Sequence, residues 1–156
     1  MSFYAVISGS ITYERPEDFD AACRFLAENG WLRGDALVDE SGTTSDNAGI
    51  DRDKRRIDLG HRVVYCNLAC HLDVLFQGGR GTVVWTSIDR CFDGTTITDG
   101  VKTACKLEKW AKEQLGVTMP NPDEDIDAWI DAAFDVQEEF HKRYVGSARS
   151  AAATNR

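Results

Sequence analysis

Residues 81–104, GTVVWTSIDRCFDGTTITDGVKTA, carry the clearest fold signal in the chain. Runs rich in β-branched and aromatic residues alternate there with turn residues, which is the pattern of short β-strands. Asp99-Gly100 separates the last two runs by only two residues, the strongest sequence signal for a tight hairpin. The segment therefore predicts an antiparallel meander. Its three strands are expected at 81–89, 95–98 and 101–104.

The N-terminal part predicts another strand and a helix. Apolar residues alternate over 3–13, which indicates a half-buried strand with Gly9 as a bulge. Pro16 opens a helix that ends at Asn29-Gly30, because proline suits a first helical turn and glycine ends one. A short strand is expected around 36–38.

The middle of the chain has weaker signals. Residues 41–56 are small, polar or charged and predict a mobile loop. Residues 60–77 are apolar on nearly every side, which favours a buried central helix. The β-branched pair Val63-Val64 is also compatible with a strand at the start of this segment. Residues 107–115 predict a short helix closed by Gly116.

Residues 121–144 predict an amphipathic helix with one acidic face. Asn121 suits an N-cap and Pro122 a first helical position. The apolar stripe consists of Ile126, Trp129, Ile130, Ala133, Phe134, Phe140 and Tyr144. The opposite side carries Asp127, Asp131, Asp135 and Glu138. This acidic row is either a solvated face or a docking face for a basic partner.

These elements predict an α+β fold. An antiparallel sheet, made of the N-terminal strand and the C-terminal three-strand meander, would be packed on one face by about four helices, including the central buried helix. The 156 residues fit one domain, expected at 1–145. The small residues of 146–156 predict a flexible C-terminal tail.

Composition narrows the classes of function. The net charge is −8, which disfavours direct binding to nucleic acid. There is no apolar run of membrane-spanning length and no signal-peptide pattern, so a cytoplasmic protein is expected. Five cysteines fit reduced thiols. Because Cys66, Cys70, Cys91 and Cys105 lack the paired spacing of a zinc site, no metal or cofactor is predicted.

A set of polar residues suggests a second kind of site. We expect a pocket between the 41–56 loop, a buried Asn67/His71 pair and the turn at 87–94. The ligand-binding candidates are Arg55, Asn67, His71, Ser87, Asp89 and Asp93. Asn67 and His71 are either a hydrogen-bonded core pair or face a ligand, in which case His71 would act as an acid or base. Phosphate-loop, nucleophile-elbow and zinc-protease motifs are missing, so no catalytic residue is assigned.

Three functional hypotheses follow. The favoured one is a small acidic binding or inhibitory protein that associates with a basic protein surface and, in its strongest form, competes with nucleic acid for that surface. The alternative is a small-ligand protein, for a nucleotide or metabolite, or a modest enzyme that uses the pocket. The third is a homo-oligomer with Trp85 or Trp129 at its interface.

Overall fold

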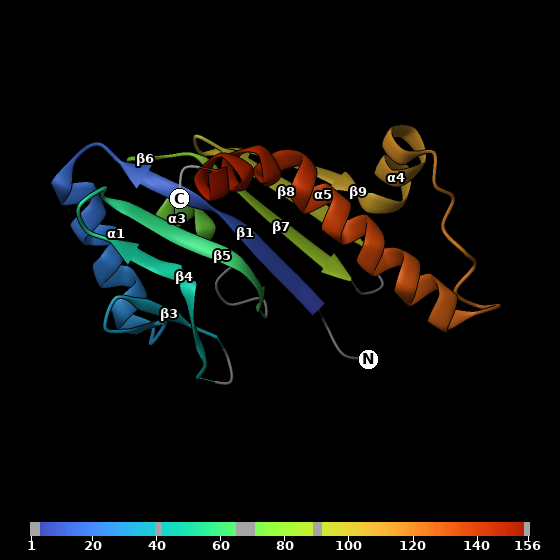
Figure 1. The fold of residues 1–156 in the computed structure, drawn as a ribbon, viewed down its shortest axis with the longest axis horizontal. Helices are drawn as coiled ribbons and strands as arrows, with labels where there is room; N and C mark the ends of the chain where they lie inside the picture. The colour runs from blue at the N-terminus through green and yellow to red at the C-terminus, as the bar shows by residue number, and fades with distance from the viewer. Residues whose placement is uncertain (1–3, 40–41, 65–70, 89–91, 155–156) are drawn as a thin grey trace.

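The computed structural model describes residues 4–39, 42–64, 71–88 and 92–154. Within them, nine strands form one antiparallel sheet with the order β2-β3-β4-β5-β1-β7-β8-β9, and β6 pairs with β1 (Figure 1). The strands are β1 (Tyr4–Tyr13), β2 (Leu32–Arg33), β3 (Ala36–Val38), β4 (Thr44–Asp51), β5 (Arg56–Val64), β6 (Gly79–Arg80), β7 (Thr82–Ile88), β8 (Asp93–Thr98) and β9 (Val101–Lys106).

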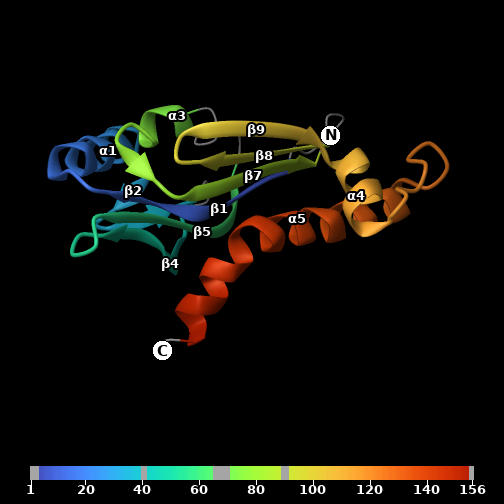
Figure 2. The same cartoon turned by 90° about the horizontal axis from the view of Figure 1, so that it is seen from above.

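Four helices in the described residues cover the sheet. They are α1 (Pro16–Glu28), α3 (Leu72–Leu75), α4 (Leu107–Leu115) and α5 (Ile126–Thr154). Helices α1 and α3 lie on one face of the sheet and α5 lies on the other, with α4 beside α5 at one end (Figure 2). The α+β class is therefore confirmed, whereas the expected packing on one face alone is wrong. Each face has its own apolar core.

Strand β1 lies between the two cores, and its residues alternate between them. Ala5 and Ile7 are fully buried in the core under α1. Val6 and Ser8 are buried on the opposite side, toward α5. The pairing of β1 with β5 shifts at Gly9, which confirms the predicted bulge. Gly9 has a φ of +116°, and a Cβ there would collide with the carbonyl oxygen of Thr82 on β7.

The meander is confirmed as β7, β8 and β9. The two-residue turn between β8 and β9 has φ values of +51° at Asp99 and +86° at Gly100. Positive φ at both positions is what a type I′ hairpin turn requires. The short strand expected around 36–38 is also present as β3.

The predicted central helix at 60–77 is wrong in the described residues. Strand β5 continues to Val64, and the only helix that follows in the described part of this range is the four-residue α3. Ile57 and Leu59 of β5 are both fully buried on the α1 side. Their spacing of two residues places them on the same face of a strand.

The mobile loop expected at 41–56 is also wrong, because residues 44–51 form β4. Strand β4 pairs with β5 through Ile50 and Ile57, among other residues. Within the described part of this range, irregular backbone remains at Gly42-Thr43 and in the turn between these two strands. Arg55 in this turn has a φ of +49°, and its Nε donates to the carbonyl oxygen of Tyr13.

Helix α5 begins later and ends later than expected. Asp125 occupies the capping position, since its Oδ1 accepts from the backbone N–H of Ala128 at 3.1 Å. Asn121 instead closes a separate turn, in which its Oδ1 accepts from the N–H of Asp123. At the other end, the helix continues to Thr154, so its backbone extends through most of the segment expected to be a tail.

Candidate functional site

The residues of the predicted ligand pocket lie in separate parts of the structure. Strands β5, β1 and β7 separate β4 from β8 in the sheet order. The turn that carries Arg55 is therefore several strands away from Asp93. Asn67 and Asp89 lie outside the described residues. The structure does not bring the remaining candidates together into one pocket.

His71 is exposed rather than buried, which contradicts the sequence prediction. It precedes the first turn of α3, and its ring packs edge-on against Phe25 with the centroids 5.6 Å apart. Trp31 packs against the same pair of rings. These aromatic contacts explain its position through packing, without a ligand.

Ser87 and Asp93 do come together, as directly paired residues of β7 and β8. Ser87 is buried, and Asp93 forms an ion pair with Lys106 of β9 at 2.9 Å. The carboxylate is thus held by a neighbouring strand. Among the described residues, no group of three or more His, Cys, Asp or Glu side chains is arranged to hold a metal ion.

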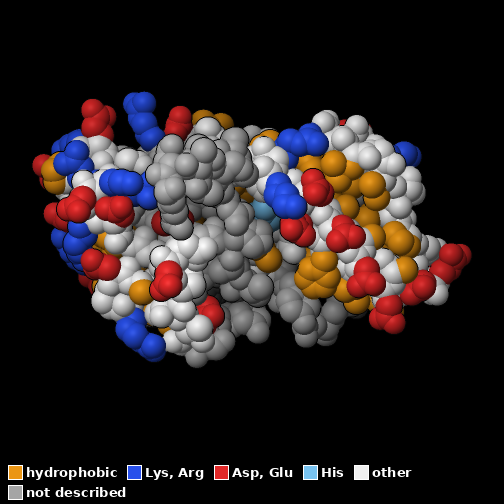
Figure 3. All heavy atoms as spheres, viewed as in Figure 1, with side chains coloured by type: hydrophobic (Ala, Val, Ile, Leu, Met, Phe, Trp, Pro, Cys, Tyr) orange, Lys and Arg blue, Asp and Glu red, His pale blue; other side chains and the backbone are white. Residues whose placement is uncertain are grey.

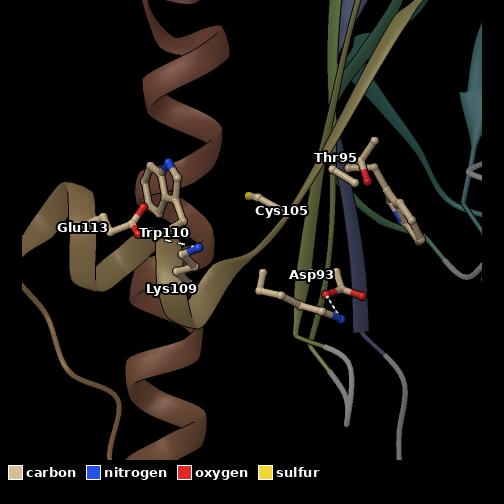
Figure 4. Close-up of a pocket in the computed structure, with 9 residues that line it drawn as sticks. Asp93, Thr95, Cys105, Lys109, Trp110 and Glu113 are labelled. Atoms are coloured by element: carbon tan, nitrogen blue, oxygen red, sulfur yellow. Dashed lines mark ion pairs between the residues drawn. The ribbon is translucent and has the colours of Figure 1, made fainter.

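An open groove of about 550 Å³ borders this ion pair. It is lined by Trp85, Asp93, Thr95, Ala104, Cys105, Lys106, Lys109, Trp110 and Glu113. Cys105 and Trp110 lie on one side of the sheet edge and Thr95 on the other (Figure 4). The groove therefore follows the edge strand β9 instead of enclosing a convergent set of reactive groups. Burial raises the pKa of the Cys105 thiol, which disfavours the nucleophilic thiolate.

A second open groove lies over β3, β4 and β5. Its acidic residues are Asp35, Asp46, Asp51 and Asp58. Asp35 forms a two-pronged ion pair with Arg52, with N–O distances of 2.9 and 3.0 Å. This hydrogen-bonded guanidinium lowers the pKa of Asp35. Because both side chains are about half exposed, the pair contributes little to stability.

The net charge of the molecule is concentrated at α5. Residues 121–141 contain eight Asp and Glu residues and no Lys or Arg, whereas the rest of the chain has 18 acidic and 18 basic residues. The whole excess of −8 thus belongs to the first half of α5 and the turn before it. In Figure 3, acidic side chains gather over this end of the molecule.

The four predicted partner-binding residues Asp127, Asp131, Asp135 and Glu138 are all exposed. Glu138 pairs with Lys142 one turn later at 3.3 Å. The first three aspartates take part in no ion pair with the other described residues. Their charges therefore face solvent without local compensation.

Apolar side chains lie beside this acidic row. Ile126 is 48% exposed and Phe134 is 42% exposed, although both are expected in the buried stripe. Ala133 and Phe140 of the expected stripe are buried, together with Val136 and Val145, so the buried stripe is shifted around the helix. Figure 3 shows hydrophobic and acidic side chains intermixed on this face. We name the surface formed by Ile126, Asp127, Ile130, Asp131, Phe134 and Asp135 the α5 acidic surface.

A buried histidine fixes how α5 sits on the sheet, and the sequence analysis missed it. His141 is fully buried. Its Nδ1 lies 2.6 Å from Ser8 Oγ on β1, and its Nε2 lies 2.7 Å from Thr86 Oγ1 on β7. With no accessible surface at Ser8 either, these groups anchor the helix rather than attack a substrate. The anchor sets which side of α5 faces outward.

Both tryptophans of the oligomer hypothesis are partly buried within the molecule. Trp85 packs against the core under α1, and Trp129 contacts Phe92 with ring centroids 5.4 Å apart. Each side chain has intermediate exposure. A homo-oligomer stays a prediction.

No helix among the described residues is both long enough and apolar enough to cross a membrane. Comparisons with protein-family models, with curated proteins and with solved structures find no match. The fold and the α5 acidic surface define an α+β protein with one strongly acidic end.

Proposed function

We propose that this protein is a binding protein that docks a basic, partly apolar protein surface against the α5 acidic surface. The observation that carries this proposal is the confinement of the entire net charge of −8 to residues 121–141, next to exposed apolar side chains. A solvated face needs charge alone. A docking face also needs apolar area that its partner can cover.

The charge distribution favours association with a cation-rich partner. Asp127, Asp131 and Asp135 recur every four residues, which spaces them by about 6 Å along the helix axis. Uncompensated carboxylates in such a row create a local negative potential that accelerates the encounter with a basic surface. This contribution is screened over about 8 Å at physiological salt, so binding is expected to weaken as salt rises.

The apolar side chains supply the part of the affinity that salt does not screen. Burial of apolar area contributes about 25 cal/mol per Å². Ile126, Ile130 and Phe134 form a row next to the row of aspartates on α5, so one partner helix with basic and apolar residues on adjacent faces contacts both rows.

In its strongest form, the proposal includes competition with nucleic acid. A basic surface that binds phosphates recognises regularly spaced negative charge. The aspartate row offers such charge on a rigid helix. A partner that uses its basic surface for nucleic acid would then release the nucleic acid when α5 docks.

The test uses a helical peptide of arginine and leucine, with the two residue types on adjacent faces. Its affinity for the wild-type protein is measured by calorimetry at low salt. The variant D127N/D131N/D135N is expected to bind about tenfold more weakly, since each exposed pair contributes about 0.2–1 kcal/mol. Ile126→Ser is expected to weaken binding as well, and a peptide with serine in place of leucine should lose affinity for every variant.

The matched control neutralises three exposed acids elsewhere, as E14Q/D20N/E28Q. Both triple variants carry a net charge of −5, so a difference between them reports location rather than total charge. Equal affinities for the two triples would overturn the proposed site. An affinity that does not change between low and high salt would overturn its electrostatic basis.

A further inference from the structure

The free edge of β9 is a second surface suited to binding. Strand β9 ends the strand order of the sheet, so one of its two edges has no neighbouring strand among the described residues. Its first four residues are exposed. No described element crosses β9 in Figure 2. An uncovered strand edge is a template for pairing with another extended chain.

The hairpin geometry shows which backbone groups this edge presents. A two-residue turn joins β8 and β9, so the flanking residues Thr98 and Val101 form a hydrogen-bonded pair. Bonded and non-bonded pairs then alternate along the ladder. At the far end of the ladder, the N–H of Leu107 donates to the carbonyl oxygen of Phe92 at 3.0 Å. Alternation from the Thr98/Val101 pair predicts a hydrogen-bonded pair at this position, so the two ends of the ladder agree.

The alternation directs the N–H and C=O groups of Lys102 and Ala104 away from β8. Both residues are exposed, and neither has a recorded hydrogen bond to another element among the described residues. Ala104 has only a methyl group beside this edge, so an incoming backbone can approach closely. Two donors and two acceptors are thus available to an added strand.

The groove along β9 provides space for the side chains of such a strand. An added strand places its side chains alternately on the two faces of the sheet. The groove has residues on both faces of the sheet beside β9, with Cys105 and Trp110 on one face and Thr95 on the other (Figure 4). Backbone pairing combined with pockets for alternate side chains is the pattern of peptide recognition by strand addition.

The charge of Lys102 at this edge favours an acidic occupant. Four of the six lysines in the chain lie within 102–112, namely Lys102, Lys106, Lys109 and Lys112. Lys106 pairs with Asp93 and Lys109 with Glu113, whereas Lys102 takes part in no ion pair with the other described residues. Lys102 is exposed and lies on the same face of β9 as Lys106. A second copy fits less well, because antiparallel self-pairing centred on Ala104 places Lys102 opposite Lys106 in both halves. Like charges directly opposite each other destabilise a sheet.

We propose that β9 accepts an extended acidic segment of another protein as an additional antiparallel strand. The segment pairs with the backbone of Lys102 and Ala104 and places carboxylates beside Lys102. This interaction goes beyond the proposed function, because it uses a different surface and a partner of opposite charge.

The probe is a labelled, end-capped peptide of alternating glutamate and valine, titrated by fluorescence anisotropy. We expect it to bind the wild-type protein, and the same peptide with lysine in place of glutamate to bind at least about tenfold more weakly. Ala104→Pro removes an outward-facing N–H, which an edge strand tolerates, and should weaken binding about tenfold. Lys102→Glu should weaken it about threefold, whereas Lys54→Glu, in the turn after β4, should not.

A second measurement keeps the wild-type protein and changes the peptide. N-methylation of alternate residues removes the donors that face β9 and should abolish binding. Amide exchange at Lys102 and Ala104 should be fast in the free protein and slow in the complex. If the acidic peptide fails to bind, or binds equally well after N-methylation, the proposal is overturned.

Discussion

The Tyr13 phenol is buried beneath α1, where it donates a hydrogen bond to the carbonyl oxygen of Leu75. Burial, followed by the nearby Cys23 and Asp18, raises the pKa of this phenol. Above about pH 10 the unfolded chain loses this proton while the folded protein keeps it, so the free energy of unfolding falls by up to about 1.4 kcal/mol per pH unit.

For Tyr13→Phe, the free energy of unfolding is therefore expected to fall less steeply than that of the wild type between about pH 10 and pH 11, as measured by urea unfolding. The variant also lacks the hydrogen bond to Leu75, which lowers its stability at neutral pH. Parallel curves for the variant and the wild type in the alkaline range would contradict the assignment.

His141 provides a second prediction at the residue scale. Thr86→Val and Ser8→Ala each remove one hydroxyl from a site that excludes water, which should cost about 1–3 kcal/mol in the free energy of unfolding. Thr12→Val, on an exposed position of β1, should change it by less than about 0.5 kcal/mol. Losses of similar size at all three positions would show that the histidine does not anchor α5.

The His141 anchor illustrates what sequence reasoning missed in the candidate site. The four exposed acids of α5 follow from helical spacing, which is a local pattern. The partners of His141 lie 133 and 55 residues away in the chain, and no local pattern identifies them. The same anchoring and packing decide that Phe134 is exposed, although helical periodicity alone predicts its burial.

Among the elements, α5 allows a direct test of where the helix begins. Asp125→Ala removes the acceptor for the N–H of Ala128 and a carboxylate at the positive helix end, so it should cost about 1 kcal/mol. Asn121→Ala affects only an exposed turn and should cost less. Urea unfolding of both variants measures the difference, and a larger loss for Asn121→Ala would contradict the observed helix start.

The strands of the meander were predictable because their signals are local. Asp99-Gly100 defines a hairpin without reference to the rest of the fold. Strand β5 was missed because its alternation of apolar and polar residues is short: it covers 56–59 and is interrupted by Gly60, His61 and Arg62. The alternation of Ile57 and Leu59 was the available signal, but these residues lie between a segment interpreted as a loop (41–56) and one interpreted as a helix (60–77).

For the whole molecule, the separation of charge implies a cost in stability. Asp131 has a like charge four residues away on each side, at Asp127 and Asp135. Asp131→Asn should therefore raise the free energy of unfolding by up to about 1 kcal/mol at low salt, and by less at high salt. Asp53→Asn, in an exposed turn, provides the control. A destabilised Asp131→Asn variant would show that the carboxylate has a structural role.

Docking at α5 is best tested by an NMR titration of the labelled protein with the arginine and leucine peptide at low salt. We expect the largest chemical-shift changes to fall within residues 126–138 and to disappear at high salt. Shift changes centred on α1 or β4, or none at saturating peptide, would contradict a docking role for α5.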